Sequence, residues 1–162
     1  MRASRLVPLI ALALVACKPA AEPKAGEAST SESVAQPGLA AKEGRLVLPA
    51  VKGNPGAAYF SIFNGNDAVE TIASVAIAGA GKAEMHRSSM DTMTRLDTVT
   101  IKPTWTERFI PGARHVMAFD LDPKLVPGGE TEMTLTFADG EKFSIPLKIE
   151  AAGITMDHGD MH

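Results

Sequence analysis

The sequence contains one cysteine, Cys17, among 162 residues. A single cysteine excludes a disulfide within the chain. Cys17 also lies near the N-terminus, ahead of a long polar segment, so a site for a soft metal ion in the folded part must be built without thiolate. A blue-copper electron-transfer centre needs a cysteine ligand to the metal. That class of protein is therefore disfavoured.

The sequence also lacks the short motifs of the common enzymes. There is no nucleophile elbow, no phosphate-binding loop and no helix with paired zinc-binding histidines. A catalytic zinc or copper site built on histidines is a further alternative, but no residue pattern identifies a general base, and such a site would leave the methionines unexplained. An excess of positive charge is missing as well, which argues against nucleic acid as a partner. We therefore predict a binding protein rather than an enzyme.

Long apolar runs are absent except at the N-terminus. Arg2 and Arg5 precede an apolar run over residues 6–16 that is too short to span a bilayer, as in a signal peptide. The run ends directly before Cys17, which resembles the bacterial lipobox and predicts lipidation of Cys17; an ordinary secretory peptide is the alternative. Removal of residues 1–16 lowers the formal net charge from −3 to −5, which suits an acceptor protein with a basic patch.

The rest of the chain divides into three parts. Residues 17–43 are rich in Ala, Pro, Glu, Ser and Lys, which predicts a disordered linker behind the lipidated cysteine. Residues 44–150 form the predicted domain, and residues 151–162 form a flexible tail rich in His and Met. Short runs with period-two alternation predict strands, and no convincing helical period appears. The expected strands cover residues 58–63, 69–77, 82–86, 95–101, 108–110, 115–121, 131–137 and 142–149. The fold class predicted is all-β, a Greek-key sandwich or barrel.

Histidine and methionine occur together. Of the four histidines, His86 is followed by Met90 and Met93, and His115 by Met117. The other two lie in the tail among methionines and aspartates, and the predicted auxiliary metal residues there are Met156, His158, Met161 and His162. Copper(I) is a soft ion that favours thioether and imidazole donors. The pattern therefore indicates copper binding in an oxidising compartment.

Strand periodicity sorts the candidate ligands. His115 and Met117 are two residues apart and share one face of a strand, although the alternation of Met117 with Phe119 leaves a core position open. Met85 is expected on the face opposite His86, in the core, and Met133 in the core as well. Met90 and Met93 are expected in a loop after the strand of His86, which could fold back toward a metal.

Four segments carry a family resemblance, residues 55–64, 84–86, 115–117 and 135–140. Together they resemble the periplasmic copper chaperones called PCuAC over roughly residues 45–149. The resemblance implies a cupredoxin-like fold. It also implies Cu(I) binding and delivery of copper to a respiratory oxidase, directly to an oxidase subunit or through another periplasmic chaperone.

The family pattern is a His, a Met eleven residues later, and a His-x-Met pair. His86 matches the first His, and His115 and Met117 match the pair. The intermediate Met has no match: Asp97 or, with a one-residue deletion, Leu96 stands there, and neither is a thioether. Met90 or Met93 could replace it, or the site could have three ligands or be weakened. The tail resembles the extensions of some members, which suggests Cu(II) or a second ion.

These observations define two hypotheses. The first is a monomeric Cu(I) chaperone that faces the periplasm and is anchored through Cys17 to the inner or outer membrane, with His86, His115 and Met117 as core ligands. The second is an accessory lipoprotein that scavenges copper with its tail and has a degenerate core site.

Overall fold

The computed structural model describes residues 37–153, and every regular element in this range is a β-strand. The strands are β1 (Leu39–Val47), β2 (Gly56–Asn64), β3 (Glu70–Ile77), β4 (Ala80–Ser89), β5 (Thr92–Leu96), β6 (Val99–Ile101), β7 (Trp105–Phe109), β8 (Arg114–Leu121), β9 (Glu130–Phe137) and β10 (Lys142–Glu150). Within this range no helix has the length and apolar character needed to cross a bilayer.

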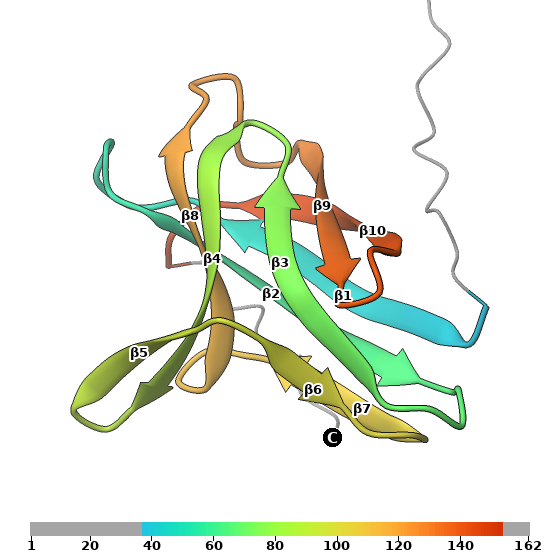
Figure 1. The fold of residues 1–162 in the computed structure, drawn as a ribbon. Helices are drawn as coiled ribbons and strands as arrows, with labels where there is room; N and C mark the ends of the chain where they lie inside the picture. Colours follow the sequence, from blue (N-terminus) through green and yellow to red (C-terminus); the bar gives the residue numbers. More distant parts are fainter. Residues whose placement is uncertain (1–36, 154–162) are drawn as a thin grey trace, which may run out of the picture. The chain divides into compact units, whose positions relative to one another are not determined.

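The strands form one strongly bent sheet (Figure 1), in the order β5-β4-β8-β7-β2-β1-β10-β9-β3-β6. β2 also pairs with β8, and β1 pairs in parallel with β10. Hairpin neighbours such as β9 and β10 alternate with strands distant in sequence, as Greek-key connections require. The predicted all-β, barrel-like fold is confirmed.

A single apolar core lies inside the bent sheet. Period-two alternation in β2 turns Ala58, Phe60 and Ile62 inward, and Phe60 stacks on Phe109 of β7 with ring centroids 4.3 Å apart. Nine of the ten strands contribute buried side chains to this core, and β5 contributes only the partly buried Leu96. Each fully buried large apolar side chain contributes about 1.5–3 kcal/mol relative to an exposed one.

The domain begins earlier than its composition predicts. β1 starts at Leu39, inside the segment 17–43 that was expected to be a disordered linker. Leu39 is buried in the core and lies opposite Asn64 of β2, and the Gly65 amide donates a hydrogen bond to the Gly38 carbonyl. Leu39, the partly buried Ala41 and the backbone hydrogen bonds of the strand hold this polar segment against the core.

The segment after His86 differs most from the prediction. β4 continues to Ser89, and a turn at residues 90–91 leads into β5, so Met93 lies in a strand rather than in a loop. Register pairing of Ser89 with Thr92, with their hydroxyl oxygens 2.7 Å apart, closes the hairpin. The predicted strand 95–101 is two strands, because β5 pairs with β4 whereas β6 pairs with β3. The β4–β5 hairpin projects from the barrel in Figure 1.

Candidate metal centre

The candidate site begins with two histidines on neighbouring antiparallel strands. His86 of β4 and His115 of β8 are directly opposite in register. Directly opposed residues project from the same face of a sheet with Cβ atoms about 4.5–5.5 Å apart. The two imidazole centroids are 6.1 Å apart and the rings are inclined by 27°. Strand pairing alone therefore brings together two of the predicted ligands, from positions far apart in the sequence.

Met117 joins this pair on the outer face of β8. Val116 and Ala118 are fully buried in the core, so His115 and Met117 alternate with them and project from the other face. Met117 therefore lies outside the core, and the alternative interpretation of Met117 as a core residue is wrong.

Two other methionines behave as predicted. Met85 is buried on the core side of β4, and Met133 is completely buried in β9. Both confirm the expectation that they fill the core.

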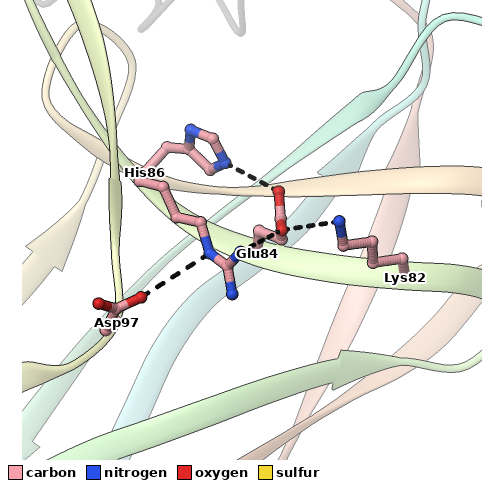
Figure 2. A network of polar contacts seen from close by, with 5 residues as sticks. Lys82, Glu84, His86 and Asp97 are labelled. Carbon is pink, nitrogen blue, oxygen red and sulfur yellow. Dashed lines mark hydrogen bonds and ion pairs between the residues drawn. The ribbon is translucent and has the colours of Figure 1, made fainter.

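The hydrogen bonds of His86 leave one ring nitrogen available for a ligand. Its Nε2 lies 3.3 Å from the Glu84 carboxylate, as Figure 2 shows. A carboxylate only accepts hydrogen bonds, so Nε2 carries the proton and Nδ1 holds the lone pair. Nδ1 is buried and has no hydrogen-bond partner among the described residues. A buried imidazole nitrogen without a partner is energetically unfavourable unless it binds something.

Glu84 is itself held by two cations. Lys82 Nζ lies 2.8 Å and Arg95 Nη1 lies 3.1 Å from its carboxylate, and Arg95 also faces Asp97 at 3.9 Å (Figure 2). The Lys82 ammonium, followed by the hydrogen bond to His86 and the charge of Arg95, lowers the pKa of Glu84. Glu84 thus remains an anion that orients His86. A carboxylate hydrogen-bonded to a ligand imidazole is a common feature of protein metal sites.

His115 is oriented in a similar way by the backbone. Its Nδ1 lies 3.1 Å from the Ala113 carbonyl, so Nδ1–H donates and the lone pair lies on Nε2. The side chain is only 5% exposed. The Tyr59 ring lies 6.4 Å away, and Arg45 stacks over Tyr59 at 5.2 Å. Burial raises the pKa of the Tyr59 hydroxyl, with Arg45 acting in the opposite direction.

The two remaining methionine candidates, Met93 and Met90, lie in different places relative to the histidines. Met93 lies opposite Ser88 in register, which places it on the same face as His86, and its side chain is 56% exposed. Met90 is fully exposed at the hairpin turn, and no contact brings it to the histidines. Leu96 lies opposite Met85 and packs against the core. The residue aligned with the expected family methionine therefore points away from the site.

The described residues supply two imidazole nitrogens and one or two thioethers to this face. They contain no group of three or more His, Cys, Asp or Glu side chains arranged to hold a metal ion. Neutral nitrogen and sulfur donors without carboxylate suit a soft ion of low charge. The tail candidates Met156, His158, Met161 and His162, and Cys17, lie outside the described residues.

Sequence reasoning missed two residues around the site. Glu84 was placed on the face of His86 but was given no role, although an acid two residues before a ligand on the same strand is a readable signal. Tyr59 reaches His115 only through the pairing of β2 with β8, which no local pattern reveals.

The fold defines a small β-barrel domain of the PCuAC type, with a pair of histidines on two of its neighbouring strands. The chain belongs to the LpqE-like lipoprotein family, whose model matches residues 39–149. None of the curated proteins matches the chain significantly.

Solved structures support the same fold. The copper-bound PCuAC domain from PmoF2 superposes with a TM-score of 0.63 at 23% identity, covering 74% of this chain and 97% of that domain. Apo-DR1885 from Deinococcus radiodurans superposes with a TM-score of 0.59 at 18% identity, covering 89% of this chain and 98% of that protein. The Cu(I) form of DR1885 gives a TM-score of 0.57 at 19% identity, covering 75% and 83%. The predicted resemblance to PCuAC domains is thus confirmed in the fold.

Proposed function

We propose that this protein is a periplasm-facing carrier of Cu(I), held at the membrane by a lipid on Cys17. The observation that carries the proposal is the His86–His115 pair, in which the buried Nδ1 of His86 lacks a hydrogen-bond partner among the described residues. Met117 adds a thioether on the same face. Imidazole and thioether together select a soft monovalent ion over the harder divalent ions. The copper-bound and Cu(I)-bound structures of similar fold support this choice.

The geometry suits a carrier that releases its ion. The His86 side chain is 14% exposed, so the site lies just below the surface rather than deep in the core. Two or three protein donors leave room for a ligand from an acceptor to bind before the donor ligands leave. A thioether binds less tightly than a thiolate, which keeps the affinity moderate. The recipient we propose is the copper site of a respiratory oxidase, reached directly or through another periplasmic chaperone.

The test is a Cu(I) competition titration of the soluble protein that begins after Cys17, measured against a chromophoric chelator. We expect one Cu(I) bound per chain at the core with moderate affinity, and we expect the double variant His115→Ala/Met117→Ala to lose it. Met90→Ala is the matched control, because Met90 is fully exposed at the turn. An unchanged stoichiometry and affinity in the double variant would contradict the ligand assignment.

The second candidate function is an accessory scavenger in which the tail binds copper and the core site is degenerate. The position of Leu96 favours it, because the side chain aligned with the family methionine packs against the core. A chain ending after Gly153 separates the two proposals. Loss of all copper binding in the shortened chain would establish the scavenger, whereas retention of the core site would establish the carrier. Any Cu(II) bound in addition would belong to the tail.

A further inference from the structure

Large apolar side chains are exposed at the end of the barrel where the chain enters the domain. Phe63 near the end of β2 is 40% exposed, Val69 in the β2–β3 loop is 57% exposed, and Trp105 at the start of β7 is 56% exposed. Among the described residues the Trp105 ring stacks on no aromatic ring and no cation. Exposed apolar groups that gather in one place mark a site of contact with a protein or a membrane.

The buried side chain of Asn64 fixes this end of the barrel. Its Nδ2 donates hydrogen bonds to the Ala68 carbonyl at 2.9 Å and to the Ile101 carbonyl at 3.1 Å, and its Oδ1 accepts one from the Asn66 amide at 2.9 Å. The side chain is completely buried. A buried amide whose hydrogen bonds are satisfied holds the segments that it joins in one arrangement.

Asn64 also brings the three apolar side chains together. It follows Phe63 directly and lies opposite Trp105 in register, and the Ala68 carbonyl that it binds belongs to the residue before Val69. The end of β2, the β2–β3 loop and the start of β7 lie together at the lower right of Figure 1. We call Phe63, Val69 and Trp105 the rim surface. It is an apolar surface on a rigid support.

The chain enters the domain at the same end. β1 begins at Leu39, opposite Asn64 in register. A segment as short as residues 18–36 reaches at most about 65 Å when it is fully extended. A lipid on Cys17 would therefore keep this end of the barrel within that distance of a bilayer.

A groove of about 430 Å³ continues from Phe63 over the outer face of β1, β2 and β7. Lys42 and Arg108 line it with positive charge, and neither forms an ion pair in the described part of the chain. Glu43 lines it with negative charge and accepts a 3.4 Å hydrogen bond from Ser61. Charges of both signs suit a zwitterionic group, whose phosphate pairs with the cations and whose ammonium pairs with the carboxylate.

We propose that the rim surface docks on the phospholipid bilayer that holds the anchor, with zwitterionic headgroups in the adjoining groove. The proposal rests on the proposed function, because the lipid on Cys17 supplies the bilayer. Tryptophan is enriched at the boundary between headgroups and acyl chains, where its ring lies in an apolar layer and its N–H reaches polar groups. A tether raises the local concentration of lipid, so a surface that binds weakly on its own remains docked.

Docking at this end leaves the histidine pair outside the lipid contact. The Tyr59 ring neighbours His115, and Phe63 lies further along β2 on the same face. At about 3.3 Å per residue, the rise of β2 from Tyr59 to Phe63 is roughly 13 Å. The pair is therefore held close to the bilayer but uncovered, where the copper site of a membrane-bound recipient can reach it.

The test uses Trp105 as its own probe, because it is the only tryptophan in the chain. A chain of residues 17–162 is coupled through its single thiol, Cys17, to phosphatidylcholine vesicles that contain a maleimide lipid. The same chain with Cys17 blocked is titrated with plain phosphatidylcholine vesicles. We expect the Trp105 emission of the coupled chain to move to shorter wavelength, and to be quenched when the acyl chains are brominated. The blocked chain should show the same changes only at high lipid concentration.

Two double variants make the test specific. Phe63→Ser/Val69→Ser retains Trp105 and should lose both the emission shift and most of the quenching. Val51→Ser/Val126→Ser is the matched control, because these comparably exposed valines lie in the loops at the opposite end of β2, and it should retain both signals. Trp105→Ala, measured by sedimentation of the blocked chain with vesicles, should reduce the bound fraction as much as the first double variant does. Circular dichroism confirms that each variant is folded.

An emission spectrum that does not change on coupling, or an equal loss in the two double variants, would overturn the proposal. A shift that depends on protein concentration without vesicles would assign the rim surface to a second copy of the chain instead. Binding only to vesicles that contain phosphatidylglycerol would overturn the assignment of zwitterionic headgroups.

The proposed function fails in different measurements. Failure of the Cu(I) titration would refute the carrier and leave the vesicle results unaffected. Mass spectrometry of the protein from bacterial membranes that shows no lipid on Cys17 would refute the anchor. The titration of the blocked chain would still decide whether the rim surface binds lipid.

Discussion

Replacement of Glu84 tests how the protein prepares His86 for its ligand. In Glu84→Ala the Nε2–H of His86 loses its acceptor at 3.3 Å, so the ring is free to rotate and to exchange its tautomer. Nδ1 would then no longer be fixed as the free nitrogen beside His115. Loss of such a supporting carboxylate typically weakens metal affinity by about 10–100-fold.

The same change should have little effect on folding. Lys82 and Arg95 are mostly exposed, and exposed ion pairs contribute little to stability. Glu84→Gln keeps an acceptor oxygen but removes the charge, so its affinity should lie between that of the wild type and that of Glu84→Ala.

The assay is a Cu(I) competition titration at fixed pH, with thermal unfolding of each variant measured in parallel. Glu130→Ala is the matched control, because Glu130 is an exposed acid on β9, a strand that pairs with β10 and β3 and not with the strands of the histidine pair. Equal Cu(I) affinity in Glu84→Ala and the wild type would refute the role of Glu84. A fall in affinity accompanied by an equal effect in Glu130→Ala would show a general charge effect instead.

Three further predictions concern Tyr59, the two side chains Leu96 and Met93, and Met133. Tyr59 is the only tyrosine, so an absorbance titration of the phenolate reports on it alone; its midpoint should lie above 10.0, and Arg45→Ala should raise it further, because burial raises this pKa and Arg45 lowers it. The contribution of Tyr59 to the free energy of unfolding is complete below the unfolded pKa and is lost as the pH rises through the folded pKa. A midpoint at or below 10.0 would contradict the burial of the Tyr59 hydroxyl. Leu96→Met should leave the Cu(I) affinity unchanged, because this side chain packs against the core. Met93→Leu should weaken the affinity, because it removes a thioether on the face of His86. A higher affinity in Leu96→Met and an unchanged affinity in Met93→Leu would instead place the missing ligand at position 96. Met133→Ala should cost about 2–5 kcal/mol in denaturant unfolding with unchanged copper stoichiometry, and a neutral result would show that Met133 is not a core residue.

Local periodicity predicted much of the fold and part of the site. The i, i+2 spacing placed His115 and Met117 on one face, and alternation placed Met85 and Met133 in the core. These inferences succeed because side-chain direction in a strand depends only on neighbouring residues.

The pairing of His86 with His115 was beyond local reasoning. Strand register between β4 and β8 is a long-range property, determined by how the whole core packs. The family resemblance implied that His86 and His115 bind the same ion, and the register of β4 with β8 gives the geometry of the two rings.

The hairpin after His86 was misread because its turn residues, Met90 and Asp91, resemble a loop, and because Thr92 to Leu96 is a short run. A one-residue change of alignment in this region moves a side chain to the other face of the strand. That is why the alignment of Leu96 with the missing methionine could not be judged before the register was known.

The central claim is that one Cu(I) ion binds Nδ1 of His86 and Nε2 of His115. The most direct measurement is long-range ¹H–¹⁵N correlation NMR of the histidine rings before and after one equivalent of Cu(I). We predict that His86 Nδ1 and His115 Nε2 shift together, while the other nitrogen of each ring remains protonated by its hydrogen bond to Glu84 or to Ala113. Shifts confined to His158 and His162, with His86 and His115 unchanged, would contradict the account.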